Sequence, residues 1–319
     1  MRIVSFLPSA TEMLYALGLG EQLVGITHEC DYPPEVLGKP VVVRSSMDPK
    51  GLSPLQIDEI VSRTLRAGQS LYVADEQLLK NLQPDLIITQ DLCQVCAPSG
   101  NEIGRVVKYL PKTPKILWLT PTCLSDIFEN LLQVGESTHK VTESKSLVDR
   151  LKKRIEAVSN LTQYLKNRPR VFCFEWLAPV YNSGHWMPEL IELAGGVDRL
   201  ARKGQDSTRI SWKQIVEYGP EFLFLSPCGF KLEEVLGQAS LFTQFPGWQE
   251  LRAVREDKVY CFDANSYFAR PGPRVVEGVE LLASVLHPEK FSWSGPSDAY
   301  RKLTMNDLLT LSKNRVKIH

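Results

Sequence analysis

Short, uninterrupted runs of apolar residues are the feature that most narrows the folds open to this chain. They include RIVSFL near the N-terminus, then QLVGIT, PVVV, PDLIIT and KILWLT, and RVFCF in the second half. Strands that do not alternate apolar with polar residues are buried on both faces, as in a parallel sheet covered by helices. Helix starts fall between them: Ser9–Glu12 has capping-box spacing, and Ser53 precedes Pro54 at a first helical position. The pattern predicts an α/β fold.

The stretch from about Thr138 to Asn167 has a different character. Its apolar residues recur at helical spacing, charged residues fill the gaps, and it contains neither glycine nor proline. The sequences on the two sides of this stretch resemble each other, as in LQPDLIIT and YGPEFLFLS. The usual turn residues between the helices and strands of an α/β fold explain this similarity as well as an internal duplication does. We expect two α/β lobes with parallel sheets, joined by one long helix, with a ligand cleft between them. The predicted parts are lobes at 1–137 and 168–290, a linking helix at 138–167 and a C-terminal tail at 291–319.

Composition excludes several classes of partner. The 319 residues suffice for two domains, and Lys plus Arg number 37, as do Asp plus Glu. A net charge of zero gives no electrostatic reason to expect nucleic acid as a partner. No run approaches the roughly 18 apolar residues of a membrane span, so we expect no membrane insertion.

Cysteine usage and the N-terminus bear on location. Seven cysteines are an odd count, which is not a disulfide framework and fits a reducing compartment. The opening MRIVSFLPSATEML has no apolar signal core and no small-residue cleavage site. We expect a cytoplasmic protein. A periplasmic or extracellular location stays open if the sequence is that of a processed protein.

Side chains that can bind ligands follow several of the apolar runs directly. Ligands of open parallel sheets sit outside the carboxyl ends of the strands. A cleft there would therefore be lined by aromatics, sulfur, histidines and an arginine, although each histidine and tryptophan also has a purely structural reading. The candidates are His28, Cys30 and Tyr32 after LVGIT, Cys93 and Cys96 after PDLIIT, Glu175, Trp176, Tyr181, His185 and Trp186 after RVFCF, Trp212 in a polar loop, and Tyr267, Phe268 and Arg270 after KVYCF.

The pair Cys93 and Cys96 has three readings. A thioredoxin-type redox pair needs a helix N-terminus, but Pro98 and Gly100 follow, so any helix begins beyond the pair. A structural zinc site needs four ligands, and His28 and Cys30 would supply the other two if the loops meet. The third reading is a tight loop that shapes a pocket wall. No Ser-His-Asp spacing, G-x-S-x-G, P-loop or G-x-G-x-x-G is present, so nothing in the sequence demands an enzyme.

Several longer stretches together resemble one family. They are RIVSFLPSATEMLYALGLGEQLVGITHECDYPPE, LQPDLIIT, VFCFEWLAPVYNSGHW, RISWKQI and YFARPGPRVVEGVELL. The resemblance is to the cobalamin (vitamin B12) binding proteins of ABC transporters, whose superfamily of substrate-binding proteins also contains siderophore and haem binders. It implies two lobes bridged by a helix, and it carries ligand contacts to Tyr32, Tyr181, Trp212, Tyr267 and Arg270. Two tryptophans of the family pattern are missing here, one near Ser46 and one at Gln90.

These observations predict a binding protein for cobalamin or a related large planar or metal-chelate ligand held between the lobes. The resemblance also implies an ABC transporter permease as partner, although the acidic docking residues of the family have no clear counterpart here. The alternative is a metal- or thiol-dependent enzyme on the same scaffold, with zinc or iron at His28, Cys30, Cys93 and Cys96. The predicted ligand-binding residues are His28, Tyr32, Cys93, Cys96, Glu175, Trp176, Tyr181, His185, Trp186, Trp212, Tyr267, Phe268 and Arg270.

Overall fold

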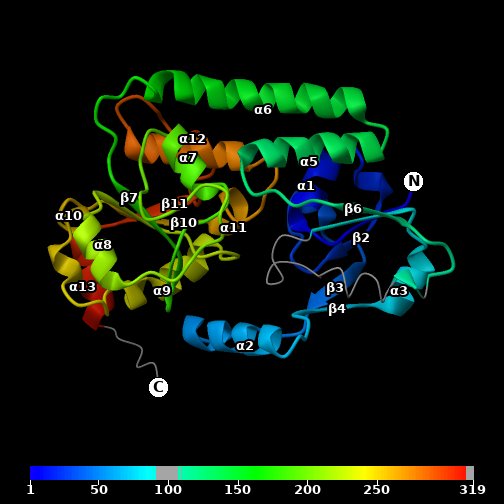
Figure 1. Ribbon diagram of the computed structural model, residues 1–319, viewed down its shortest axis with the longest axis horizontal. Coiled ribbons are helices and arrows are strands. Elements are labelled where there is room, and N and C mark those ends of the chain that lie inside the picture. The colour runs from blue at the N-terminus through cyan, green and yellow to red at the C-terminus, as the bar shows by residue number, and fades with distance from the viewer. Residues whose placement is uncertain (91–106, 109, 314–319) are drawn as a thin grey trace. The chain divides into compact units, whose positions relative to one another are not determined.

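The fold is given by a computed structural model (Figure 1), and the residues that the structure describes are 1–90, 107–108 and 110–313. Contacts group the chain into two compact units, and each is described by itself. Unit 1 comprises Met1–Leu52, Gln56–Pro121 and Ser125–Arg150, and unit 2 comprises Ser53–Leu55, Thr122–Leu124 and the chain from Leu151 onward.

Unit 1 is built on a sheet with the strand order β4-β3-β2-β1-β5-β6. Its neighbouring strands run parallel except for β4, which is antiparallel to β3. The strands are β1 (Ile3–Ser5), β2 (Leu23–Thr27), β3 (Val41–Ser45), β4 (Tyr72–Ala74), β5 (Leu86–Thr89) and β6 (Lys115–Trp118). The helices in this part of the chain are α1 (Pro8–Ala16), α2 (Pro54–Arg66), α3 (Glu76–Leu82) and α5 (Leu124–Ser137), with short 3-10 turns at Gly20–Gln22 and Pro34–Val36.

The core of unit 1 forms around β1 and β5, which are buried along their whole length. Val4 and Ile87 are fully buried and pack in one cluster with Leu79 of α3. The predicted capping box at Ser9–Glu12 is wrong. Helix α1 begins at Pro8 with Leu7 as its N-cap and no side-chain cap, so Ser9 and Glu12 lie inside the helix and are buried. Proline at a first helical position needs no N–H partner, which makes this start possible.

Unit 2 holds a second sheet with the strand order β11-β10-β9-β7-β8. The central strands β7, β9 and β10 run parallel, and the edge strands β8 and β11 are antiparallel to their neighbours. The strands are β7 (Val171–Leu177), β8 (Val180–Asn182), β9 (Phe222–Leu225), β10 (Val259–Phe262) and β11 (Tyr300–Leu303). The helices are α7 (Met187–Leu193), α8 (Trp212–Tyr218), α9 (Leu232–Phe242), α10 (Arg252–Arg255), α11 (Ala264–Tyr267), α12 (Val275–Leu286) and α13 (Met305–Lys313), with a 3-10 turn at Trp248–Glu250.

Alternation along the central strands gives the second sheet two apolar faces. Phe172, Leu223 and Val259 are lateral neighbours on one face, which is covered by α8, α9, α10 and α13. The other face lies against α7 and α12, where Ile191 and Leu286 close on Val171 around Gly196 (Figure 1). Burial on both faces explains why these strands read as continuous apolar runs.

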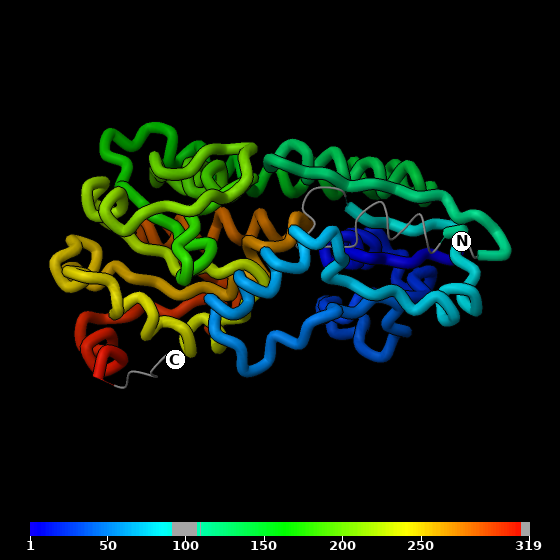
Figure 2. Tube along the Cα trace, turned by 60° about the horizontal axis from the view of Figure 1, so that its bottom comes forward, coloured from blue at the N-terminus to red at the C-terminus, as the bar shows by residue number. Residues whose placement is uncertain are grey.

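Helix α6 (Val141–Thr162) confirms the predicted long helix, although it is shorter at both ends than the sequence indicated. The division between the units falls inside it, after Arg150. Its second half is fixed within unit 2 by a bidentate ion pair from Arg154 to Glu280, with N–O distances of 2.8 and 2.7 Å. The tube trace shows this helix in green (Figure 2).

The predicted fold class is confirmed, with a correction at the sheet edges. The sequence predicted parallel sheets, but β4, β8 and β11 are antiparallel. For β8 the reason is the connection of two residues, Ala178 and Pro179, which can join only antiparallel neighbours. The domain limits predicted at 137, 167 and 290 stay predictions. Within the residues that the structure describes, no helix is long and apolar enough to cross a membrane.

Candidate functional site

Aromatic side chains gather at the carboxyl end of β7 in unit 2. Trp176 on β7 and Tyr181 on β8 are direct cross-strand partners. The Trp176 indole donates to the carbonyl of Ala178 at 3.1 Å, and its ring lies 5.3 Å from that of Phe230. All three aromatic residues are half-buried. They form an aromatic wall, defined here as Trp176, Tyr181 and Phe230, that offers ring surface to a flat, apolar ligand.

A cationic side chain, that of Arg209, contacts this aromatic wall. The guanidinium of Arg209 donates through Nε to the Tyr181 hydroxyl at 3.0 Å, and its central carbon lies 5.6 Å from the centroid of the tyrosine ring. Both contacts orient the ring, because a hydrogen bond from a charged donor is directional and the ring face attracts a cation. An isolated antiparallel bridge between Tyr181 and Arg209 fixes the two backbones side by side as well.

Glu175 and His185 lie beside the aromatic wall, but both are engaged with the protein itself. The Glu175 carboxylate accepts the N–H of Gly184 at 3.0 Å and a hydrogen bond from the Ser207 side chain. Burial raises the pKa of Glu175, and those hydrogen bonds oppose the rise. Nε2 of His185 lies 3.0 Å from a carboxylate oxygen of Asp206.

Four further predicted residues are buried inside unit 2. Trp186 and Arg270 are each 6% exposed, and Tyr267 and Phe268 are each 5% exposed. The Trp186 indole donates to the carbonyl of Phe268 at 2.7 Å, and burial raises the pKa of Tyr267 to about 12. These four side chains therefore belong to the interior of unit 2, beneath the carboxyl ends of its strands. Their predicted ligand contacts stay predictions.

Trp212, also a predicted contact, packs on the rim of the core of unit 2. Its ring stacks on Phe245 with centroids 4.5 Å apart and planes 11° apart. The indole N–H donates to the carbonyl of Pro246 at 2.8 Å. Trp212 is the first residue of α8, so the cap of that helix sets the position of its ring.

Three predicted residues of unit 1, His28, Cys30 and Tyr32, follow β2, as the sequence indicated. His28 is exposed and its Nδ1 lies 3.2 Å from the Thr27 hydroxyl, while the buried Cys30 thiol lies 3.1 Å from the Thr11 hydroxyl. Tyr32 is 43% exposed. Cys93 and Cys96 lie outside the described residues. Within those residues, no group of three or more His, Cys, Asp or Glu side chains could hold a metal ion, so the zinc or iron site stays a prediction that depends on the two cysteines.

Two members of this arrangement, Arg209 and Phe230, were not among the predicted residues. Phe230 follows the apolar strand β9 by five positions, which is the same kind of strand-end position that identified the other candidates. Arg209 opens the stretch RISWKQI, but nothing in that stretch shows that its side chain reaches Tyr181. That contact arises only because the loop before α8 pairs with β8.

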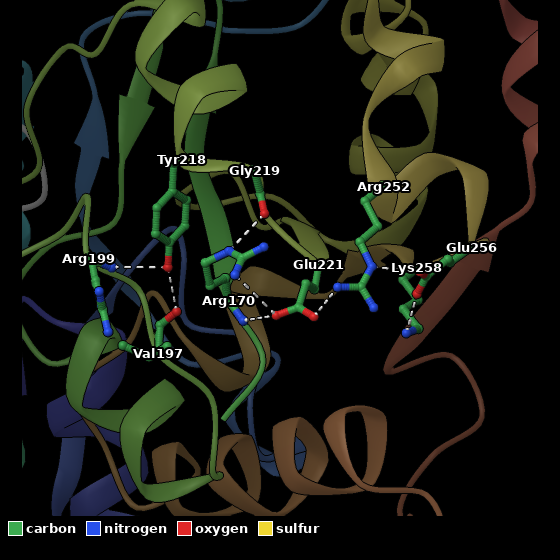
Figure 3. A network of polar contacts seen from close by, with 9 residues as sticks. All are labelled: Arg170, Val197, Arg199, Tyr218, Gly219, Glu221, Arg252, Glu256 and Lys258. Atoms are coloured by element: carbon green, nitrogen blue, oxygen red, sulfur yellow. Dashed lines mark hydrogen bonds and ion pairs between the residues drawn. The ribbon is translucent and has the colours of Figure 1, made fainter. Parts of the chain in front are cut away.

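At the opposite end of the strands of this sheet, their amino ends, charged side chains of alternating sign are joined by hydrogen bonds and ion pairs (Figure 3). Glu221 accepts the backbone N–H of Arg170 at 3.0 Å and pairs with Arg252 at 2.6 Å. Glu256 accepts from both Arg252 and Lys258 at 2.6 Å. These contacts tie together the amino ends of β7, β9 and β10, so this edge has a structural role.

Comparison with known proteins gives a consistent result. Residues 3–265 match a family described as periplasmic binding protein. A vitamin B12-binding protein of Vibrio cholerae is 26% identical over 289 residues, which cover 89% of this chain and 88% of that protein. An uncharacterised ABC transporter substrate-binding lipoprotein of Bacillus subtilis is 24% identical, covering 91% of this chain and 81% of its own length.

Solved structures share the fold. A periplasmic vitamin B12 binding protein of Vibrio cholerae superposes with a TM-score of 0.64 at 24% identity, covering 91% of this chain and 97% of that chain. A periplasmic heme binding protein of Pseudomonas aeruginosa superposes with a TM-score of 0.70 at 16% identity, covering 94% and 97%. At such identities the likeness concerns the arrangement of strands and helices.

Proposed function

The chain belongs to the periplasmic binding protein family, and on that premise we propose that it binds cobalamin or a related large planar metal chelate. The observation that carries this proposal is the aromatic wall of Trp176, Tyr181 and Phe230 at the carboxyl edge of the second sheet. Rings held in place by hydrogen bonds and packing offer stacking surface at little entropic cost. The similarity to a vitamin B12-binding protein along 89% of the chain supports the same ligand class.

The proposal is tested by calorimetric titration of the reduced protein with cyanocobalamin and, separately, with haemin. We expect saturable binding of one of them with a stoichiometry of one. Absorption spectra and elemental analysis of the protein as purified from its source supply a second measurement, since corrin, haem or iron would be visible there. Absence of binding of both ligands at high micromolar concentration would remove this proposal.

Substitution of the aromatic wall gives a sharper test. Phe230→Ala should weaken binding of whichever ligand binds by about tenfold, because an aromatic stacking contact contributes roughly 0.5–1.5 kcal/mol beyond its buried area. Tyr164→Ala is the matched control, since Tyr164 is 80% exposed and follows the end of α6. If both variants bind like the unchanged protein, the aromatic wall is not the ligand surface.

A cytosolic location and an ABC transporter permease as partner are separate proposals. An odd number of cysteines, seven, leaves at least one thiol outside any intrachain disulfide, which favours a reducing compartment. Family membership favours a transporter partner. Fractionation of cells that make the native protein separates the two: recovery only from the cytosol argues against delivery to an extracytoplasmic permease, and recovery outside the cytosol ends the cytosolic proposal.

A further inference from the structure

A β-bulge on β7 re-aims Glu175. Phe174 pairs with Asn182 and Trp176 pairs with Tyr181, so the register shifts by one residue and Glu175 is the extra residue. A bulge turns the side chain of the extra residue out of the regular alternation, and bulges are frequent at sheet edges beside functional sites. In a regular strand Glu175 would lie on the face opposite to Trp176. The bulge breaks this alternation, and the carboxylate contacts backbone that lies beyond the strand.

That carboxylate meets two segments of chain at once. It accepts the N–H of Gly184 at 3.0 Å, and it accepts a hydrogen bond from the side chain of Ser207. The two segments are in close contact at this point, because a Cβ on Gly184 would lie 2.4 Å from the backbone nitrogen of Ser207. Only glycine fits there.

Backbone hydrogen bonds join the same two segments on either side of Glu175. His185 donates to the carbonyl of Gln205 at 2.6 Å and accepts from Gly204 at 2.8 Å, with its own backbone in the left-handed region at φ 51°. Asn182 donates to the carbonyl of Thr208 at 3.1 Å. A non-glycine residue in this conformation is held there by its surroundings, and the Glu175 carboxylate is one of the polar groups that join the two segments, together with the Asn182 side chain, which accepts the N–H of Thr208 at 2.6 Å.

The two segments adjoin the Tyr181–Arg209 pair. Tyr181 precedes the turn at 182–185, and Arg209, which orients the Tyr181 ring, follows the loop at 204–208. We propose that Glu175 is a positioning residue: its carboxylate, re-aimed by the bulge, fixes the turn at 182–185 against the loop at 204–208 and so sets the Tyr181–Arg209 pair for ligand binding. This inference rests on the proposed function for its ligand, but the placement of the two segments can be measured without any ligand.

Two variants of Glu175 and one control separate positioning from ligand contact. Glu175→Gln keeps an acceptor for the Gly184 N–H and a donor for Ser207, whereas Glu175→Ala removes both. Glu221→Gln is the matched control, because Glu221 also accepts a backbone N–H beside a strand of the same sheet, at the opposite edge. Each variant is compared by native-state amide hydrogen exchange and by titration with cyanocobalamin and haemin.

Without ligand, Glu175→Ala should speed exchange of the Gly184, His185 and Thr208 amides by about tenfold or more relative to amides of α12, and Glu175→Gln should leave the ratio near that of the unchanged protein. With a ligand that binds, Glu175→Ala should weaken affinity by about tenfold and Glu175→Gln by much less. Glu221→Gln should alter neither quantity.

The outcomes are distinguishable. Unchanged exchange in Glu175→Ala overturns the inference, whatever binds. Equal loss of affinity in Glu175→Ala and Glu175→Gln, with normal exchange in the glutamine variant, also overturns it, because the charge would then act on the ligand directly. Failure of the unchanged protein to bind either ligand, together with faster exchange in Glu175→Ala, removes the proposed function and retains the role of Glu175 in fixing the two segments.

Discussion

Asp198 shows how far one side chain can depart from its ordinary chemistry. It follows the Gly195-Gly196 pair, and its carboxylate accepts the N–H of Leu200 at 3.0 Å. Desolvation by burial raises its pKa to about 7, and hydrogen bonds from backbone groups, including that of Cys173, and from Ser183 oppose the rise without cancelling it. The folded state therefore prefers the protonated acid across a range in which the unfolded chain is ionised.

This preference gives a pH dependence with a definite sign. A pKa raised on folding adds stability that is fully present below the unfolded value of 3.8 and is lost as pH rises through about 7. The free energy of unfolding of the unchanged protein, relative to that of Asp198→Asn, should therefore fall between pH 5 and pH 8. Urea unfolding of both proteins at the two pH values measures this. A difference that is constant or rises with pH would contradict the assignment.

Among the elements, α8 illustrates local sequence acting on the candidate site. Ser211 caps the helix because its hydroxyl accepts the N–H of Gln214, and the side-chain oxygen of Gln214 in turn accepts the N–H of Ser211. The first residue of that helix is Trp212, whose ring packs on Phe245. The cap thus fixes both the helix and the start of an aromatic stack.

Ser211→Ala should lower the free energy of unfolding by about 1 kcal/mol, because it leaves helix N–H groups without an acceptor. Ser211→Asp should keep most of the stability, since aspartate caps equally well and its charge favours a helix N-terminus. Thermal or urea unfolding followed by circular dichroism measures both variants. An alanine variant as stable as the aspartate variant would show that the cap contributes nothing.

At the scale of the whole molecule, the C-terminal segment is part of the second core. The sequence predicted a C-terminal tail at 291–319, and the structure has a helix in this segment, α13. The strand β11 was not expected; it pairs along the whole of β10. Leu303 and Leu308 are buried in the same cluster as Phe172 and Leu223.

Leu308→Ala should therefore destabilise unit 2 by roughly 2–5 kcal/mol, the usual cost of a cavity at a buried leucine. Asn306→Ala, at an exposed position of the same helix, is the control and should change stability by less than about 0.5 kcal/mol. Tryptophan fluorescence during urea unfolding is a suitable measurement, because five of the six tryptophans lie in unit 2. Equal effects of the two substitutions would mean that α13 does not belong to the core.

Sequence alone determined the features that depend on neighbours along the chain. Apolar runs predicted the central strands, and apolar residues at helical spacing without glycine or proline predicted α6, because the burial of a strand or helix face sets the local periodicity of the sequence. Stretches such as RISWKQI indicated the family. Tertiary structure decided what depends on distant pairings. The bulge at Glu175 depends on the register of β7 against β8, and Arg209 contacts Tyr181 across 28 positions of sequence. No local pattern encodes such contacts, since they exist only once two segments are held side by side by a shared sheet.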